Sequence, residues 1–372
     1  MRYGKKIGGD NRIQAWISLH FVRPNFLPLV FMVSFVAVIV TSGRVFDFPV
    51  SLNFYTGMTF FILAPSLAIL ALCAACFVTL LKNRPDRPAV FLFTKLIEDW
   101  RLLERIASGL PIFLGLPIVF SAFTSYKSAM GKIVPFYADP YALAFDRMIH
   151  GTDPWRLLHF ATGFPFATKI IDIIYIFWFL AVLGVISIVI FVLRDERLRS
   201  QYLSAFMLSW ILVGCLAATL LSSAGPCYYS AFYASDPYAD LFHYLDQVGE
   251  IYPLKVLGSQ EMLLKYYTQN VTGFGAGISA LPSMHVAVTV LNGIFLSKIN
   301  RVAGIAAWIF AAIIFVGSVH LGWHYAIDGY AAALLVFPIW FIAGKLADRF
   351  EPPDKFEKYL VNMIEKLEPF RS

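Results

Sequence analysis

The sequence predicts an all-α protein that crosses a membrane several times, as a polytopic bundle of about eight transmembrane helices. Its 372 residues are 59% hydrophobic and only 15% charged, and the mean hydropathy is +0.68. Soluble domains usually contain about 45–50% apolar and about 25% charged residues. Lipid must therefore be the solvent for much of the chain. The aromatic fraction of 16% fits the belts that Trp and Tyr form at both membrane interfaces.

Eight apolar runs supply the expected spans, and each is close to the ~20 residues that a bilayer core requires. No run has a charged residue in its central part. The first run is preceded by basic residues, but it starts late and lacks a clear cleavage site, so we predict a retained span rather than a signal peptide. The expected spans are Phe26–Ser42, 58–81, 109–126, 171–193, 202–222, 284–297, 302–319 and 327–346.

The basic residues indicate the orientation of these spans. If successive spans cross the membrane in alternating directions, most of the 30 Lys and Arg residues lie on the same side as the N-terminus. Because cytoplasmic loops concentrate Lys and Arg, we expect both termini in the cytoplasm. The net charge of +6 then reflects this bias. We expect no nucleic-acid partner, since no basic run is interleaved with aromatic residues in a soluble domain.

The segments between the spans suggest four regions. Residues 89–108 mix apolar and charged positions at helical spacing, which is typical of a helix on the inner membrane surface. Residues 223–283 form a long outer loop, and loops of this length are usually functional. The expected regions are an N-terminal membrane region of three spans (1–126), an outer interfacial segment (127–169), a helical core (170–346) and a cytoplasmic tail (347–372).

Two outer segments carry residues suited to chemistry. In the first, Pro282 fits the first turn of a helix and Ser283 can accept a hydrogen bond from a free amide there. His285 would then project from the first turn, where unpaired amides and the helix dipole favour an anion.

The second segment contains His320, His324 and Asp328, which are four residues apart. If one helix runs through them, they share a face. Asp328 can accept a hydrogen bond from one nitrogen of His324, which leaves the other nitrogen as a lone pair pointing outward. A histidine oriented in this way is a nucleophile or a general base.

Topology brings these segments together. The fifth span ends, the sixth begins, the seventh ends and the eighth begins on one side, so Gly225-Pro226, His285 and His324 all lie at the outer surface. The outer acidic residues are scattered, so we expect them to cap loops rather than to bind a metal ion. We expect no metal and no cofactor, since the sequence has no P-loop, no dinucleotide fingerprint and no His-Glu-x-x-His motif.

Two patterns at these residues resemble known signatures. Pro282-Ser283-x-His285 and His324-Tyr-x-x-Asp328 are similar to the second and third motifs of the type 2 phosphatidic acid phosphatase superfamily. The wider patterns resemble its inositol phosphorylceramide synthase branch most closely. These patterns are Gly277-x-Ser279 before the first motif, His320-x-Gly before the second, and Asp146-Arg147 followed by Gly151-x-Asp-Pro.

The resemblance implies a metal-independent phosphoryl transfer on a lipid phosphoester at the extracytoplasmic face. His324 would attack phosphorus, Asp328 would orient it, and His285 would protonate the leaving oxygen. A phosphohistidine would form, and water or an alcohol would then take the phosphoryl group. Such chemistry depends chiefly on positioning and charge stabilisation.

The sequence departs from the superfamily where three cationic phosphate ligands usually stand. Ala224 and Gly225 precede Pro226 where the first motif has basic residues, and Ser318 stands at the position of an arginine in the third. This fits a phosphodiester substrate, which has less charge to bind. The residues we expect at the phosphate instead are Ser279, Ser283, His320, Arg147, Lys255 and Lys265.

We therefore expect a sphingolipid-type headgroup transferase, with hydrolysis of phosphatidate or a polyprenyl diphosphate as the alternative. The partners would be a membrane lipid and an acceptor, either a lipid or small alcohol or water. A transporter is less favoured because the spans lack central charges. An inactive scaffold is less favoured because His285, His324 and Asp328 are intact. The short N-terminus and modest length favour a bacterial inner membrane with the site facing the periplasm.

Overall fold

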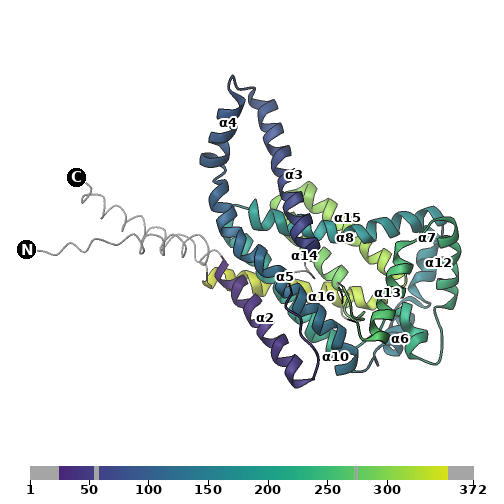
Figure 1. Cartoon of the computed structure of the whole chain (residues 1–372). Coiled ribbons are helices and arrows are strands. Elements are labelled where there is room, and N and C mark those ends of the chain that lie inside the picture. Colours follow the sequence, from purple (N-terminus) through teal and green to yellow (C-terminus); the bar gives the residue numbers. More distant parts are fainter. Residues whose placement is uncertain (1–24, 54–57, 272, 274, 351–372) are drawn as a thin grey trace, which may run out of the picture.

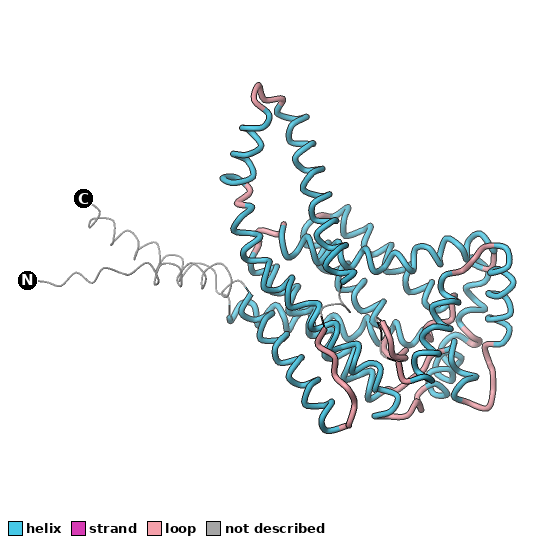
Figure 2. Tube along the Cα trace, in the orientation of Figure 1, coloured by secondary structure: helices cyan, strands magenta, loops and turns pink. Residues whose placement is uncertain are grey.

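A computed structural model describes residues 25–53, 58–271, 273 and 275–350, and across these residues the chain forms helices and no strands (Figure 2). Within this described part, seven helices are long and apolar enough to cross a membrane, and α14 (Met284–Ile299) is a shorter apolar helix. Together they correspond to the eight expected spans, which confirms the fold class. The termini, 1–24 and 351–372, lie outside the described residues, and so does our prediction that both are cytoplasmic.

The eight span helices follow one another in chain order. They are α2 (Phe26–Val45), α3 (Met58–Asn83), α5 (Leu102–Ile133), α8 (Pro165–Phe191), α9 (Glu196–Ile211) continued by η5 (Leu212–Ala217) and α10 (Ala218–Leu220), α14, α15 (Arg301–His320) and α16 (Ala326–Phe350). The shorter helices are α4 (Pro88–Thr94), η4 (Lys95–Asp99), α6 (Asp139–His150), α7 (Pro154–Thr162), η6 (Pro226–Tyr228), α11 (Tyr229–Phe232), α12 (Ala239–Ile251) and α13 (Lys255–Gln269).

Helix α5 is longer than the apolar run that predicts it. The expected span covered 109–126, whereas the helix extends to Ile133 and includes Lys127 and Lys132 near its end. The helix also starts at Leu102, which lies within the segment 89–108 that was expected on the inner membrane surface. The earlier part of that segment forms α4 and η4. Charged residues end an apolar run, but they do not end a helix, because Lys is a good helix former.

Helix α14 lies in the middle of the bundle (Figure 1) and packs against α8, α9, α15 and α16. Its residues from Val286 to Gly293 are all buried. Two glycines bring it close to α15. A Cβ added at Gly293 would lie 2.9 Å from the Trp308 ring, and one at Gly304 would lie 2.6 Å from Ser297 Oγ. Such small residues let helix backbones approach closely in membranes, so α14 is held firmly at the centre.

The long outer segments are folded rather than loose. Helices α6, α7, α12 and α13 gather at one end of the bundle (Figure 1). Residues 223–283, expected as a loop, supply α12 and α13 of this cap. At the same end α8, α14 and α16 begin and α5 and α15 end, because the spans alternate in direction.

Three buried aspartates fasten the cap to the bundle. Asp139 accepts hydrogen bonds from the amides of Ala224 at 2.9 Å and Gly225 at 2.7 Å. Asp146 accepts from the first two amides of α16, those of Ala326 at 2.7 Å and Ile327 at 2.9 Å. Asp172 holds the start of α13 in the same way, through the amides of residues 255 and 256 at 3.2 and 3.0 Å. A carboxylate at a helix N-terminus satisfies free amides and opposes the helix dipole.

Replacing Asp146 tests this fastening. Asp146→Ala leaves two buried amides of α16 without an acceptor, so we expect the free energy of unfolding to fall by about 2–4 kcal/mol. The measurement is thermal unfolding in detergent, followed by tryptophan fluorescence. Asp246→Ala, at an exposed position of α12, is the matched control and should leave the midpoint unchanged. Equal midpoints for Asp146→Ala and the wild type would contradict this role.

Candidate active site

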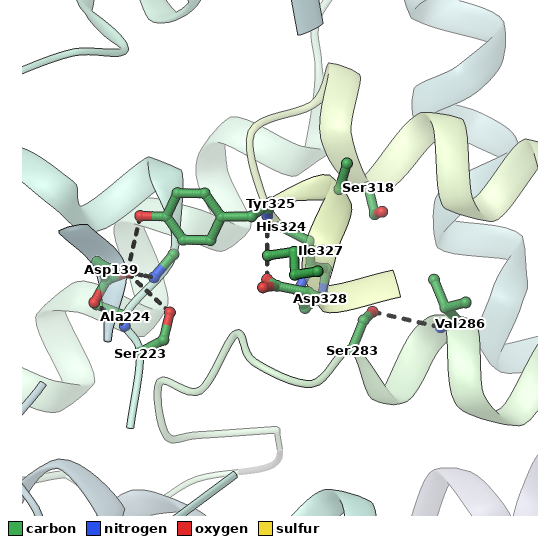
Figure 3. Close-up of polar contacts among 12 residues, drawn as sticks. Asp139, Ser223, Ala224, Ser283, Val286, Ser318, His324, Tyr325, Ile327 and Asp328 are labelled. Carbon is green, nitrogen blue, oxygen red and sulfur yellow. Dashed lines mark hydrogen bonds and ion pairs between the residues drawn. The ribbon is translucent and has the colours of Figure 1, made fainter. Parts of the chain in front are cut away.

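His324 and Asp328 form the hydrogen bond that the sequence predicts. His324 Nδ1 lies 3.2 Å from Asp328 Oδ2, which also accepts from the Tyr325 amide at 3.1 Å (Figure 3). The condition of one helix through His320, His324 and Asp328 is not met, however. Helix α15 ends at His320, and α16 begins only at Ala326. The break occurs near Gly322, whose φ of +71° is accessible to glycine.

The turn before α16 is anchored on both sides of His324. The amides of Trp323 and His324 both donate to the Ser318 carbonyl at 3.0 Å. The Tyr325 hydroxyl donates to Asp139 Oδ1 at 3.0 Å (Figure 3). Asp146 holds the next two amides, as described above. The backbone on either side of His324 is therefore fixed, so its ring has little freedom to turn away.

His285 faces His324 from the first turn of α14. Their ring centroids are 5.9 Å apart. Ser283 is the N-cap, as predicted: its Oγ accepts from the Val286 amide at 3.4 Å, and its own amide donates to the Asp328 carbonyl at 3.1 Å. Pro282 lies just before this cap rather than in the first turn. The hydrogen bond from the Ser283 amide to the Asp328 carbonyl links the starts of α14 and α16 directly.

Two aromatic rings of α8 support His285. The Tyr175 ring stacks on it with centroids 4.9 Å apart and planes at 22°, and the Trp178 ring lies 4.4 Å away. Trp178 Nε1 also donates to the His285 carbonyl at 3.1 Å. Both residues were missed from the sequence, because an aromatic residue inside an apolar span resembles any other core residue.

The segments that contain Gly225-Pro226, His285 and His324 converge here, as the topology predicts. The Ala280 amide donates to the Ser223 carbonyl at 2.9 Å, and the Cys227 amide donates to the Gly322 carbonyl at 2.9 Å. At Gly225, where φ is +97°, a Cβ would lie 2.7 Å from the Trp323 carbonyl oxygen. Only glycine fits so close an approach. Segments 223–227, 277–285 and 318–328 therefore form one layer.

Burial controls the charge of His324. The residue is 6% exposed. Burial lowers the pKa of its imidazole to about 3, the Ala280 backbone opposes this shift, and the Lys127 ammonium adds to it. The ring is therefore neutral near pH 7, and it faces the interior of the site rather than outward. Burial also raises the pKa of Asp146, while its two amide partners act in the opposite direction.

The other predicted phosphate ligands lie in different surroundings. Both ring nitrogens of His320 are occupied, at 2.9 Å from the hydroxyls of Thr162 and Thr168. Arg147 makes a bidentate pair with Asp153, at 2.6 and 3.2 Å. The side chains of Lys255 and Lys265 are exposed on α13, and Ser279 is half-buried in the segment that leads to α14. The structure thus brings Ser283 to the histidine pair, whereas His320 and Arg147 are engaged elsewhere.

A sequence profile of the PAP2 superfamily matches residues 141–342, which is more than half of the chain. The match runs from α6 to α16 and includes His285, His324 and Asp328. No curated protein and no solved structure matches the chain.

The buried neutral state of His324 predicts a pH effect on stability. Its folded pKa of about 3 lies below the usual value near ~6.5. Between these values the unfolded chain binds a proton that the folded chain does not, so stability is lost as the pH falls below ~6.5. We expect this cost to be about 2 kcal/mol at pH 5.

Thermal midpoints at pH 7.5 and pH 5.0 measure this cost. The midpoint of the wild type should fall by more than that of His324→Gln, which has no titrating ring. The midpoint of His243→Gln, at an exposed position of α12, should fall by as much as that of the wild type. Identical falls for the wild type and His324→Gln would show that His324 is not held neutral by burial.

Proposed function

The chain belongs to the PAP2 superfamily, and we propose that it is a membrane enzyme that transfers the phosphoryl group of a lipid phosphoester through His324. The observation that carries the proposal is the arrangement of His324, oriented by Asp328 at 3.2 Å, facing His285 at a ring separation of 5.9 Å. Both histidines lie beside the N-terminus of α14, where free amides and the helix dipole favour a phosphate.

The geometry supports a two-step reaction. When Nδ1 of His324 donates to Asp328, Nε2 holds the lone pair that attacks phosphorus. The new P–N bond forms as the bond from phosphorus to the leaving oxygen breaks, and His285 gives that oxygen a proton. In the second step an acceptor hydroxyl loses its proton to His285 and attacks the phosphohistidine, which frees His324. Each step uses only side chains of this chain, so the proposal needs no metal or cofactor.

Within this class we propose headgroup transfer of the inositol phosphorylceramide synthase type. Support comes from the Gly277-x-Ser279 and His320-x-Gly patterns and from the neutral residues Gly225 and Ser318. A site with few cations suits a phosphodiester, which carries one negative charge. Hydrolysis of phosphatidate or a polyprenyl diphosphate is the second candidate, because water can replace the acceptor alcohol in the same mechanism.

We also propose that the protein resides in a bacterial inner membrane with its site towards the periplasm. Several apolar helices support a multi-pass membrane protein. The histidine pair lies at the capped end of the bundle, and more of the Lys and Arg residues of the described part lie towards the other end.

Removal of the proposed nucleophile should abolish activity. We expect His324→Ala to lower kcat/KM by about 10³-fold or more, and Asp328→Asn by about 10²–10⁴-fold. The substrates are phosphatidate, undecaprenyl diphosphate, and phosphatidylinositol with ceramide, all in EDTA. Free phosphate and lipid products are measured together. His243→Ala is the matched control and should retain wild-type rates.

The products separate the two candidates. A new phosphosphingolipid without free phosphate identifies a headgroup transferase. Free phosphate from a monoester or diphosphate, lost in His324→Ala, identifies a phosphatase. Activity that survives in His324→Ala, or that EDTA abolishes, would contradict the histidine mechanism.

A further inference from the structure

The histidine pair lacks an obvious permanent cation for a phosphate. Gly225 and Ser318 stand where the superfamily motifs have arginines, the span before Pro226 has no Lys or Arg, and Arg147 is paired with Asp153. A transferred phosphoryl group needs positive charge around its oxygens. Lys127, near the outer end of α5, is the residue that the structure brings towards this site.

The segment that carries the site rests directly on Lys127. At Gly277, where φ is +98°, a Cβ would lie 2.5 Å from the carbonyl carbon of Lys127 and 2.6 Å from its oxygen. Residues 277–285 therefore start against the backbone of α5 at this lysine and then lead through Ser283 to His285.

The neighbouring turn of α5 faces the start of α14. A Cβ at Gly214 would lie 3.1 Å from Met284 Sδ and 3.2 Å from the Phe123 ring, so Phe123 and Met284 border the same space. Lys127 is four residues after Phe123, so the two share a face of α5. That face is the one turned towards Met284, the residue before His285.

Electrostatics agree with this placement. After burial, the Lys127 ammonium is the charge that lowers the pKa of His324. Lys127 is half-buried, and its side chain makes no ion pair or hydrogen bond with any residue in the described part of the chain. An ionisable side chain within a membrane span ordinarily has a partner, since leaving its charge unpaired is costly.

A second group at the site also lacks a partner. The Tyr175 hydroxyl is buried, with the residue 5% exposed, and it has no hydrogen-bond partner among the described residues. Its ring stacks on His285, with centroids 4.9 Å apart, so the residue lies directly at the histidine pair. A buried hydroxyl without a partner is costly, which points to an acceptor that arrives with the substrate.

We propose that Lys127 binds the phosphoryl group during transfer, with the Tyr175 hydroxyl as a neutral donor beside it. This inference rests on the proposed function and deepens it. One ammonium matches the single charge of a phosphodiester better than the two charges of a phosphomonoester, so Lys127 would favour diester donors. A lysine that merely extends towards the headgroups is the competing interpretation.

Binding of inorganic phosphate to the full chain in detergent tests the proposal, with isothermal titration calorimetry as the readout. We expect Lys127→Met to raise the Kd for phosphate by about 10-fold or more, and Lys127→Arg to stay within about 3-fold of the wild type. The matched control is Lys132→Met, which removes the same charge from an exposed position on the same helix. It should leave the Kd unchanged.

Turnover is measured on the same samples. Lys127→Met should lower kcat/KM for the lipid donor by at least as much as it weakens phosphate binding. Tyr175→Phe keeps the ring on His285 and removes only the hydroxyl, so it tests the same pocket if Lys127→Met does not fold. We expect it to weaken phosphate binding by about 3–10-fold.

The outcomes distinguish this inference from the proposed function. If the wild type turns over a lipid phosphoester and Lys127→Met does so equally well, the inference is overturned and the function stands. Equal losses of phosphate affinity in Lys127→Met and Lys132→Met would show only an effect of general surface charge. That result also overturns the inference. If the wild type neither binds phosphate nor acts on any of the three lipids, the proposed function fails as well.

Discussion

The pair of hydrogen bonds from the amides of Ala326 and Ile327 to the buried carboxylate of Asp146 fixes the start of α16, and the rest of the site depends on it. Asp328 lies in that first turn, and it orients His324 and receives the Ser283 amide at its carbonyl. The start of α14, and with it His285, is therefore placed relative to α16. A carboxylate from α6 thus sets the distance between two histidines that are 39 positions apart in the chain.

Most of the fold could be predicted from the sequence because lipid imposes a simple rule: each span must be apolar and of sufficient length. The His324–Asp328 hydrogen bond could also be predicted from the sequence. The spacing of four residues brings the two side chains together although the helix starts only at Ala326. The separation of the spans 302–319 and 327–346 was predicted as well, whereas the position of the turn at Gly322 was not, because glycine could have continued a helix at modest cost. Lys127 was missed because it follows an apolar run, and nothing in its neighbourhood indicates a contact with Gly277 some 150 residues later.

Charge in the capped end of the bundle is distributed unusually. Asp139 occupies the amides of Ala224 and Gly225, near which the resembled motif would place basic residues. Asp139 also accepts hydrogen bonds from three hydroxyls, those of Ser223 at 2.9 Å and of Tyr233 and Tyr325 at 3.0 Å. An internal carboxylate thus shapes a loop that elsewhere would present cations to the substrate. The loop provides shape here, which is why the phosphate cation that we propose, Lys127, comes from another helix.

Helix α14 has 16 residues, which corresponds to a length of about 24 Å. A hydrocarbon core is about 30 Å thick, and α8 with 27 residues crosses it with length to spare. A central helix this short leaves part of the core to be filled by non-helical chain, and irregular backbone is tolerated at that depth only where protein covers it. Residues 276–283, which lead into α14, meet this condition, because all of them are buried except the half-buried Ser279. The short helix therefore requires a covered approach segment, and that segment is the one that brings Ser283 to the histidine pair.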